Sequence, residues 1–551
     1  FVDGFSLLPH QESALEWMMS VEKSEPQEGM RGGVLSLEKG LGKTITALTL
    51  ALSTPREENS FPTLVVCKKM YLWDTWKNEI ESKFDPPPKV IYLHKDHLSA
   101  SQIEGLTLAK LRGADLVVTS YEVCTKVMKN FPEYETQLKR VLEEEVRYGG
   151  KSAIHLRTKG QLSPRGKKGP RLIYEVEWTR VVCDESQNFV TDTSKIFKAV
   201  MGIVSDRRWC LSGSMVRNYD TDILSQLRFL GYNTITSSAE WKKIGRGCFE
   251  NRGLGKRIFQ MGYIDAGVVM PDKEEEVVPV VLTGKHREVY DLILGKLRES
   301  HRHSLKFCQL SLLTRIRQAL VAPYLLSEKA KKEKFSKRGL TFRNKEPEGE
   351  NEVITNLGSH LEKLIPADLL RWCSSKEQAG WKSPKIAKAL EIIDLVVGEG
   401  RKVIVFSTQV TALDLLASKL DLLGTEYRLI DGSVSTKFRT EYLDDFRSSD
   451  SDAPNVLLAS YKVCSESLNI SEASCAILLD LWWNNATRDQ AVARLWRMGQ
   501  KRTVQVFSLF ANNSLDARIE EICNNKELIS AKYKSGSKSV KSSPVIERLL
   551  K

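Results

Sequence analysis

The sequence predicts an α/β protein made of two parallel-sheet lobes with helical insertions. Three observations support this prediction: short apolar runs alternate with helix-forming stretches, the alternation occurs in two separate blocks, and the residues between the blocks have a different character. Alternating strands and helices are typical of βαβ units, in which the strands run parallel. At 551 residues the chain has room for about three or four domains, or for two large ones with insertions.

Apolar runs of the buried-strand type occur in both blocks. In the first block they are Gly33–Leu37, Thr63–Cys67, Lys89–Leu93, Asp115–Thr119, Arg180–Cys183 and Trp209–Ser212. In the second block they are Lys402–Phe406, Tyr427–Ile430, Asn455–Ala459, Cys475–Leu479 and Thr503–Phe507. We therefore expect a first lobe over residues 1–274, a helical protrusion and charged linker over 275–382, and a second lobe with a C-terminal tail over 383–551.

Two segments interrupt this pattern with charged residues. Residues 285–326 look helical, and the charged stretch 328–345 that follows them is expected to be a surface loop. A basic insertion over about residues 130–177 precedes the Arg180 strand. Between Lys151 and Arg171 it has seven Lys and Arg, no Asp or Glu, and a Gly, Pro and Ser background that resists packing. Each basic run is either a solvated surface or a contact for a polyanion, and its composition does not decide between them.

The overall composition excludes several protein classes. Lys and Arg number 82 against 70 Asp and Glu, which gives a net charge of +12 and argues against an acidic disordered protein. No run of eighteen apolar residues occurs, so no membrane partner is expected. The 10 cysteines are scattered without a C-x-x-C pair, and the 8 histidines form no H-E-x-x-H motif. We expect buried thiols in a reducing compartment and no structural metal.

A glycine-rich turn follows the first predicted strand. Glu38-Lys39-Gly40-Leu41-Gly42-Lys43-Thr44 leads from that strand into a helix-forming stretch. Glycines allow backbone N–H groups to curl around an anion at a helix N-terminus, where Lys43 would reach the β- and γ-phosphates and Thr44 would hold Mg²⁺. The strict phosphate-loop pattern fails at its first position, which is Leu37. A simple strand-to-helix turn with a surface lysine is the alternative interpretation.

Two adjacent carboxylates follow the strand Arg180–Cys183. Asp184 and Glu185 would lie at the carboxyl end of a parallel strand, where Asp184 fits Mg²⁺ positioning and Glu185 fits polarisation of an attacking water. Asp-Glu pairs are also common on surfaces. The pair and the glycine-rich turn together are a stronger signal than either alone.

Two arginines near the other end of the chain have helical spacing. In Gln490–Gln500, Arg494 and Arg497 would project from the same face of a helix and could enter one cleft. Planar, permanently charged guanidinium groups are suited to neutralising a transferring γ-phosphoryl group. By spacing alone, a pair of surface arginines is the better interpretation.

Motif by motif, the chain resembles the SWI/SNF-type DNA translocases, a branch of helicase superfamily two. The resemblance runs from Leu8 to about Asn525 and rests on Leu8–Gln11 with Trp17, Glu38–Thr44, Leu64–Lys68 with Trp76, Asp115–Tyr121, Trp178–Glu185, Leu211–Asn218, Ser383–Lys388, Lys402–Ser407, Asp431–Ser433 with Arg439, and Asp480–Asn484 leading into the arginine helix. It implies two tandem RecA-like lobes and a DNA-stimulated ATPase that remodels protein–DNA complexes in chromatin, repair or transcription.

The resemblance also implies roles for individual residues. Gln11 corresponds to the adenine-recognising glutamine, Gly40, Gly42, Lys43, Thr44 and Asp184 to the ATP and Mg²⁺ site, Glu185, Arg494 and Arg497 to further catalytic groups, and Thr119, Ser120, Ser433 and Trp483 to DNA contacts. The implied partners are double-stranded DNA and nucleosomes or other DNA-bound proteins. Nuclear residence is implied by the family, with a viral or bacterial origin left open. The oligomeric state is not predicted.

The chain departs from the family pattern at several motifs. Trp482-Trp483 and the Trp178-x-Arg180 approach look most like the branch of RING-bearing repair and transcription-termination ATPases, yet no RING cysteines are present. Leu37-Glu38-Lys39 replaces Asp-Glu-Met, Gln187 replaces a histidine and Met215 a proline. The fifth motif, Ser460–Asn469, has lost three family glycines. These changes put the coupling of hydrolysis to movement in doubt more than hydrolysis itself.

Other functions remain open on sequence grounds. One is a weakly active ATPase that serves as a DNA-binding scaffold, because the fifth motif is altered. A second is a strand-separating helicase of the same superfamily. A P-loop kinase or transporter ATPase would share the glycine-rich turn and the acidic pair but would not account for the arginines.

Overall fold

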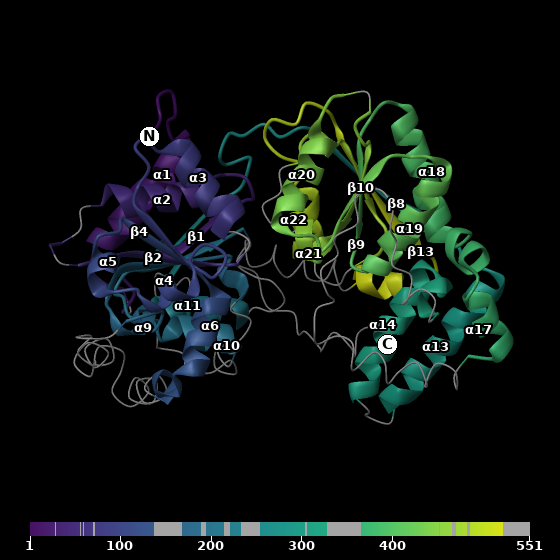
Figure 1. Cartoon of the computed structure of the whole chain (residues 1–551), viewed down its shortest axis with the longest axis horizontal. Helices are drawn as coiled ribbons and strands as arrows, with labels where there is room; N and C mark the ends of the chain where they lie inside the picture. Colours follow the sequence, from purple (N-terminus) through teal and green to yellow (C-terminus); the bar gives the residue numbers. More distant parts are fainter. Residues whose placement is uncertain are drawn as a thin grey trace. The chain divides into compact units, whose positions relative to one another are not determined.

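The computed structural model divides into two compact units, Phe1–Val269 and Met270–Lys551. The residues that it describes are 1–27, 29–54, 57–58, 60–69, 72–136, 168–188, 194–213, 221–232, 254–302, 306–327, 365–450, 452–464, 470–481 and 485–521. Most of the predicted basic insertion, the charged stretch 328–345 and the end of the C-terminal tail lie outside these ranges. Each unit is built around one sheet (Figure 1).

The sheet of the first unit has seven strands, all parallel, in the order β3-β4-β2-β5-β6-β1-β7. The strands are β1 (Gly33–Leu37), β2 (Phe61–Cys67), β3 (Val90–Leu93), β4 (Leu116–Ser120), β5 (Trp178–Asp184), β6 (Arg208–Ser212) and β7 (Ile258–Met261). The parallel α/β prediction is confirmed for this unit. Because all strands point the same way, their carboxyl ends share one edge of the sheet.

Helices cover both faces of this sheet. They are α1 (Pro9–Lys23), α2 (Lys43–Ser53), α3 (Asn78–Lys83), α4 (Ala100–Glu104), α5 (Leu108–Arg112), α6 (Tyr121–Asn130), α9 (Leu172–Glu175), α10 (Lys195–Met201) and α11 (Thr221–Leu230), with single turns η1 (Leu72–Lys77), η2 (Ser186–Asn188) and η3 (Leu254–Arg257). In Figure 1, α1, α2 and α3 lie on one side of the strands and α6, α9, α10 and α11 on the other. Met18, Leu48 and Trp76 pack with alternate strand residues such as Val65 and Val118.

The second unit also contains a fully parallel sheet, with the order β10-β11-β9-β12-β13-β8. Its strands are β8 (Lys273–Val280), β9 (Val403–Ser407), β10 (Tyr427–Ile430), β11 (Val456–Ser460), β12 (Cys475–Leu478) and β13 (Val504–Ala511). The apolar runs did not predict β8, whose first four residues are Lys273–Glu276. It is an edge strand that pairs with β13 along its whole length.

The helices of the second unit fall into two groups. Around the sheet lie α18 (Pro384–Gly398), α19 (Val410–Leu423), α20 (Thr436–Arg447), α21 (Tyr461–Cys464) and α22 (Asn485–Val492), and beside it lie α13 (Gly284–Arg302), α14 (Lys306–Val321), η4 (Pro323–Leu326), α17 (Ala367–Cys373) and η5 (Lys376–Trp381). The predicted helical region 285–326 is confirmed by α13, α14 and η4. Tyr290, Ile316 and Leu369 form a separate cluster in this second group.

A buried ion pair joins α1 to the centre of the first sheet. The Glu22 carboxylate accepts hydrogen bonds from Nε and Nη2 of Arg180, both at 2.6 Å, and from Nε1 of Trp209 at 2.7 Å. Arg180 also donates to the Thr63 hydroxyl at 3.0 Å. The side chains of Arg180 and Glu22 are 1% and 6% exposed, so each charge depends on the other for stabilisation.

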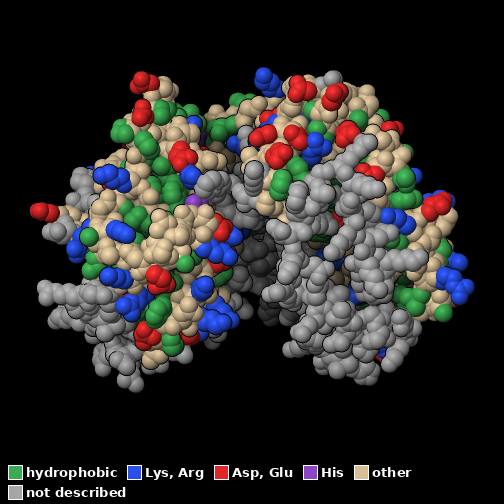
Figure 2. All heavy atoms as spheres, in the orientation of Figure 1, with side chains coloured by type: hydrophobic (Ala, Val, Ile, Leu, Met, Phe, Trp, Pro, Cys, Tyr) green, Lys and Arg blue, Asp and Glu red, His purple; other side chains and the backbone are tan. Residues whose placement is uncertain are grey.

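The surface of the described residues mixes charges of both signs. On the face drawn in Figure 2, Lys and Arg side chains are interspersed with Asp and Glu in both units. None of the helices in the described ranges has the length and apolar character needed to cross a membrane.

We predict that Glu22→Gln lowers the free energy of unfolding of the first unit by about 3 kcal/mol, because it leaves the Arg180 charge buried without its counter-charge. Urea denaturation followed by tryptophan fluorescence would measure the change. The matched control is Glu135→Gln, which breaks the half-exposed ion pair with Lys198 at 3.1 Å and should cost about 0–1 kcal/mol. An equal cost for the two variants would contradict the prediction.

Candidate nucleotide-binding site

The glycine-rich turn lies between β1 and α2, at the carboxyl edge of the first sheet. Gly40 and Gly42 have φ values of +85° and +87°, which place both in the left-handed region that favours glycine. A Cβ on Gly42 would lie 2.2 Å from Nε2 of Gln11. The glycine at position 42 is therefore required both by its backbone conformation and by the close approach of α1.

Two side chains of α1 hold the carbonyl group at the centre of this turn. Nε2 of Gln11 donates to the Leu41 oxygen at 3.2 Å, and Nε2 of His10 lies 3.0 Å from the same oxygen. The other end of the Gln11 amide accepts from the Leu8 N–H at 3.0 Å. Gln11, the residue expected to recognise adenine, thus fastens α1 to the turn in this structure, and adenine recognition stays a prediction.

Lys43 is the first residue of α2 and points back over the turn. Its Nζ donates to the carbonyl oxygens of Leu37 at 2.9 Å and Glu38 at 3.4 Å, and the side chain is 9% exposed. Thr44 follows it in the first turn of the helix. A lysine ammonium and the N–H groups of a helix N-terminus together form a site suited to phosphate oxygens.

The two acidic residues follow β5 at the same edge of the sheet. Oδ2 of Asp184 accepts from Nε1 of Trp76 at 3.0 Å, and Oδ1 accepts from the Glu185 N–H at 2.9 Å. Burial and the Glu185 carboxylate raise the pKa of Asp184 to about 6, while the Trp76 hydrogen bond and the Lys43 charge oppose this rise. The structure thus brings Lys43, Asp184 and Glu185 together, as the sequence predicted.

A chain of polar contacts links Glu185 to β6. Gln187 donates from Nε2 to a carboxylate oxygen of Glu185, and its Oε1 accepts from the Ser212 hydroxyl at 2.7 Å. The Ser186 hydroxyl donates to Oε1 of Gln226 at 2.8 Å. Ser212 belongs to the family-like motif Leu211–Asn218, but the sequence did not predict that its side chain contributes to the site. The motif Leu211–Asn218 was the available signal, and its residues from 214 onward lie outside the described ranges.

The two arginines do not lie on a helix, which corrects the helical-face prediction. Helix α22 ends at Val492, and both residues belong to a series of turns, residues 493–499, which we call the arginine turn. Some helix-type hydrogen bonds persist there, since the Ala493 and Trp496 N–H groups donate to the Asp489 and Val492 oxygens, both at 2.9 Å, and other contacts are added to them. The Arg494 oxygen accepts from the Ile470 N–H at 3.1 Å, and Nε2 of Gln500 lies 3.4 Å from the Leu495 oxygen and 2.9 Å from that of Ala473.

Arg494 and Arg497 are partly exposed and belong to the second unit, whereas Lys43, Asp184 and Glu185 belong to the first. A catalytic site shared by the two units stays a prediction.

The hydroxyls expected to contact DNA have local partners in the structure. Thr119 is fully buried and donates to the Leu93 oxygen at 2.9 Å, and Ser120 is fully buried and accepts from the Val123 N–H at 3.2 Å as the N-cap of α6. Neither hydroxyl reaches the surface, so the expected phosphate contacts are not supported for these two residues. The physical reason is that a residue at the end of a buried strand satisfies its hydroxyl within the fold.

Ser433 remains a candidate DNA contact. It is partly exposed, and its hydroxyl donates to Oδ1 of Asp431 at 2.5 Å. Trp483, the other predicted contact in the second unit, lies outside the described residues, as do positions 465–469 of the fifth motif.

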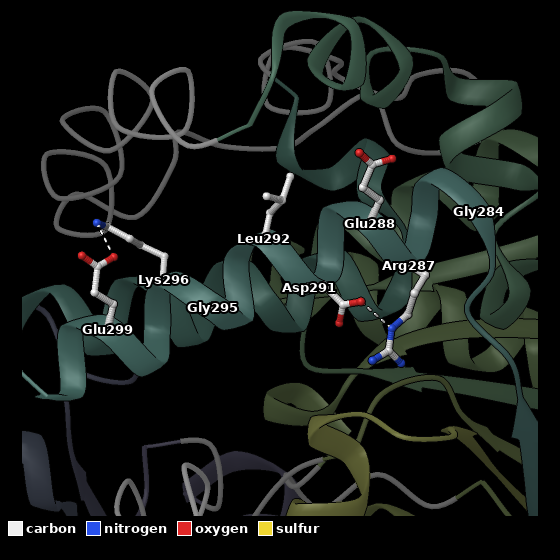
Figure 3. A pocket seen from close by; sticks show the side chains of 8 residues that line it. All are labelled: Gly284, Arg287, Glu288, Asp291, Leu292, Gly295, Lys296 and Glu299. Atoms are coloured by element: carbon white, nitrogen blue, oxygen red, sulfur yellow. Dashed lines mark hydrogen bonds and ion pairs between the residues drawn. The ribbon is translucent and has the colours of Figure 1, made fainter.

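A groove along α13 differs in chemistry from this site. Its lining comes from a single helix and includes Arg287, Asp291, Lys296 and Glu299 (Figure 3). Arg287 pairs with Asp291 at 2.8 Å and Lys296 with Glu299 at 2.7 Å, so these four charges are matched in pairs, and Glu288 adds a further carboxylate to the lining. Across the described parts of the chain, no group of three or more His, Cys, Asp or Glu side chains is arranged to hold a metal ion.

Known proteins resemble this chain along most of its length. Residues 10–325 match the SNF2-related domain, and residues 384–499 match the helicase conserved C-terminal domain. "Putative helicase 172L" of Invertebrate iridescent virus 6 is 34% identical over 598 residues, which cover 98% of this chain and 92% of the viral protein.

More distant similarities extend to a cellular repair protein and to a solved structure. DNA repair protein RAD5A of Arabidopsis thaliana is 26% identical over 84% of this chain, which spans about half (50%) of the plant protein's length. The solved structure of the Sulfolobus solfataricus SWI2/SNF2 ATPase core in complex with dsDNA aligns with 97% of this chain and 94% of its own, at 23% identity and a TM-score of 0.37.

We predict that the buried Asp184 carboxylate destabilises the ligand-free chain at high pH. Its pKa is raised to about 6 from an ordinary value of 3.8, so the folded state takes up a proton that the unfolded state does not. Stability from this group therefore increases as the pH falls through 6. Between pH 8 and pH 5, the unfolding free energy of the wild type should therefore rise by about 1.5 kcal/mol relative to that of Asp184→Asn. Urea denaturation at each pH tests this, and a pH-independent difference would contradict it.

Proposed function

Because this chain belongs to the SNF2-related, helicase-like family, which implies ATP hydrolysis, we propose that it is an ATP-driven motor that translocates along double-stranded DNA. The work done by this motor would be the remodelling of protein–DNA complexes, in chromatin, repair or transcription. The observation that supports the proposal most directly is the meeting of Lys43, Asp184 and Glu185 at one edge of a parallel sheet, beside a turn with two left-handed glycines.

The residues of the first unit fit ATP with magnesium. The Lys43 ammonium would neutralise phosphate charge, and the N–H groups that begin α2 would point at phosphate oxygens. The Asp184 carboxylate and the Thr44 hydroxyl are oxygen ligands of the kind that Mg²⁺ prefers. When bound, the ion neutralises charge that develops on the phosphates.

Glu185 is the residue that we propose to orient the attacking water. Its contacts with Gln187, and through Gln187 with Ser212, hold the carboxylate in one direction. A group fixed before the substrate arrives loses little conformational freedom in the reaction, which is how positioning accelerates phosphoryl transfer. A change in the position of the Glu185 carboxylate would move Gln187 and, through it, Ser212 at the end of β6.

The arginine turn of the second unit would complete the site. We propose that Arg494 and Arg497 neutralise the transferring γ-phosphoryl group once the two units close around ATP. Hydrolysis would then require closure, which would convert a chemical step into a step along DNA. Contacts with the phosphate backbone, Ser433 among them, would give affinity without sequence preference and a steep dependence on salt. Nuclear residence stays a prediction, and a relative of this chain is viral.

We predict that Lys43→Ala and Glu185→Gln each abolish DNA-stimulated ATP hydrolysis, with a loss of about 100-fold or more in kcat, because the first removes a charge that acts on the phosphates and the second removes the carboxylate that orients the attacking water. Phosphate release with and without duplex DNA measures the effect, and DNA binding by anisotropy should stay nearly intact. Full activity in both variants would defeat the site. Wild-type binding to DNA without turnover would instead favour a scaffold, and unwinding of a forked duplex would favour a strand-separating helicase.

A second prediction concerns the arginine turn. Arg497→Ala should lower kcat by about 10²-fold or more while ATP binding changes little, because the guanidinium is needed for the transition state and not for the ground state. Steady-state hydrolysis and equilibrium binding of a fluorescent ATP analogue separate the two. Arg502→Ala, at an exposed position just beyond the turn, is the matched control. Loss of analogue binding in Arg497→Ala would assign that residue to binding instead.

A further inference from the structure

One continuous segment, residues 261–275, joins the last strand of the first sheet to the first strand of the second. It runs from Met261, the end of β7, to Glu275 within β8. All of its residues are described, and no helix lies between the two strands. We call this segment the strap. Its contacts at each end lead to the proposed catalytic residues of the unit concerned.

At its first end the strap is fastened to the phosphate-binding turn. The Glu38 N–H donates to the Met261 oxygen at 3.1 Å, and the Tyr263 N–H donates to Oε2 of Glu38 at 3.1 Å. The Tyr263 hydroxyl donates to the Lys39 oxygen at 2.7 Å. Glu38 and Lys39 immediately precede Gly40, so a displacement of the turn would pull directly on the strap.

The strap then makes a compact turn on the first unit. The Ala266 N–H donates to the Gly262 oxygen at 3.0 Å, and the Val268 N–H donates to the Tyr263 oxygen at 2.9 Å. Ala266 and Val268 also pack against the core that contains Leu48 and Trp76. The first unit therefore holds the strap as far as Val268.

At its other end the strap is fastened to the arginine turn. Nε1 of Trp496 donates to the Pro271 oxygen at 2.7 Å, and Nζ of Lys273 lies 4.5 Å from the centroid of the Trp496 ring. Trp496 stands between Arg494 and Arg497 in the chain. The second unit therefore holds the strap from Pro271 onward, through one of the two residues that separate the two arginines.

Only Val269 and Met270 lie between the two fastened parts. Among the described residues no hydrogen bond holds either of them, and Val269 is 94% exposed. Two residues span at most about 7 Å when fully extended, so the slack in this connection is small.

We propose that the strap is a positioning element that couples the phosphate-binding turn to the arginine turn, with Tyr263 and Trp496 as its clamps and Val269–Met270 as its hinge. The inference rests on the proposed function, because it concerns how the two halves of that catalytic site are brought into register. When Gly40–Lys43 move around a phosphate, Glu38 and Lys39 move with them. Tyr263 contacts both residues, so the strap is displaced, and the short hinge limits how much of this displacement is lost. Trp496 contacts the displaced strap and therefore moves the two arginines.

The first test compares single and double clamp variants of the full chain. Tyr263→Phe removes the hydroxyl that reaches Lys39, and Trp496→Phe removes the N–H that reaches Pro271. Each should lower kcat of ATP hydrolysis by about threefold to tenfold, with KM for ATP changed less than about twofold. Because both clamps lie on one connection, losing either one already breaks it. The kcat of the double variant should therefore be no lower than that of the less active single variant. Unchanged kcat, or multiplied effects in the double variant, would overturn the strap.

Matched controls remove comparable hydrogen bonds elsewhere in the second unit. Tyr427→Phe loses a hydroxyl contact with Asp421 at 3.2 Å, and Trp381→Phe loses an N–H contact with the Ser418 hydroxyl at 3.2 Å. Neither should change kcat. A fall in the controls equal to that in the clamp variants would assign the effect to general loosening and overturn the proposal.

The second test lengthens the hinge without touching a clamp. Insertion of Gly-Gly between Val269 and Met270 keeps every contact within each unit and adds slack, so kcat should fall by about threefold to tenfold at an unchanged unfolding temperature. The same insertion between the exposed Pro86 and Pro87 is the control. Normal kcat in the hinge insertion would show that strap length is irrelevant and overturn the proposal.

Hydrogen exchange separates failure of the strap from failure of the proposed function. In wild type, a non-hydrolysable ATP analogue with Mg²⁺ should slow exchange across residues 493–499 by about threefold or more, and Tyr263→Phe should lose most of that response. An equal response in Tyr263→Phe overturns the strap even where hydrolysis is normal. Absence of Lys43-dependent hydrolysis in wild type overturns the proposed function, and the exchange response still decides the strap.

Discussion

The parallel direction of every strand is the constraint on which the candidate site depends. Carboxyl ends of parallel strands meet at one edge, so residues at the ends of β1 and β5, far apart in sequence, come together there. The Lys43 ammonium and the buried Asp184 carboxylate then act on each other, and the positive charge offsets part of the cost of burying the negative one. The Trp76 N–H opposes the same cost through its hydrogen bond to Oδ2 of Asp184, so the sheet topology that brings these groups together and the chemistry of the site cannot be separated.

Polar side chains of the motifs have a second role, which is to hold the loops that carry the chemistry. Turns at a sheet edge leave carbonyl groups outside the strand ladders, and buried carbonyls need partners. Gln11 meets that need at Leu41, and Gln187 spans Glu185 and Ser212. The Glu38 carboxylate holds the backbone at Tyr263 by accepting from its N–H group. The loops are therefore shaped by the protein before any nucleotide is present.

Most of the fold could be predicted because its signal is local. Buried parallel strands are short apolar runs, and such runs predicted every strand of the two sheets except β7 and β8. The strand β8 begins Lys-Glu-Glu-Glu and owes its place to pairing with β13, which lies more than two hundred residues later. The spacing of Arg494 and Arg497 is helical, yet helix α22 ends at Val492, and the backbone beyond it forms turns that also bond to Ile470 and Gln500. Thr119 and Ser120 were expected to contact DNA because of the family resemblance, whereas in the structure both hydroxyls have partners within the fold.

The backbone at Glu185 shows why the finest part of the site lies beyond sequence reasoning. Its φ of 51° is in the left-handed region, which costs a residue with a Cβ about 1–2 kcal/mol, and glutamate carries no signal for it. Asn188 offsets this cost, because its backbone and side-chain N–H groups donate to the Glu185 oxygen at 3.0 and 2.7 Å. Strain of this kind persists only where surrounding contacts over-determine it. The backbone conformation at Glu185 is therefore held by contacts with Asn188 that no sequence pattern reveals.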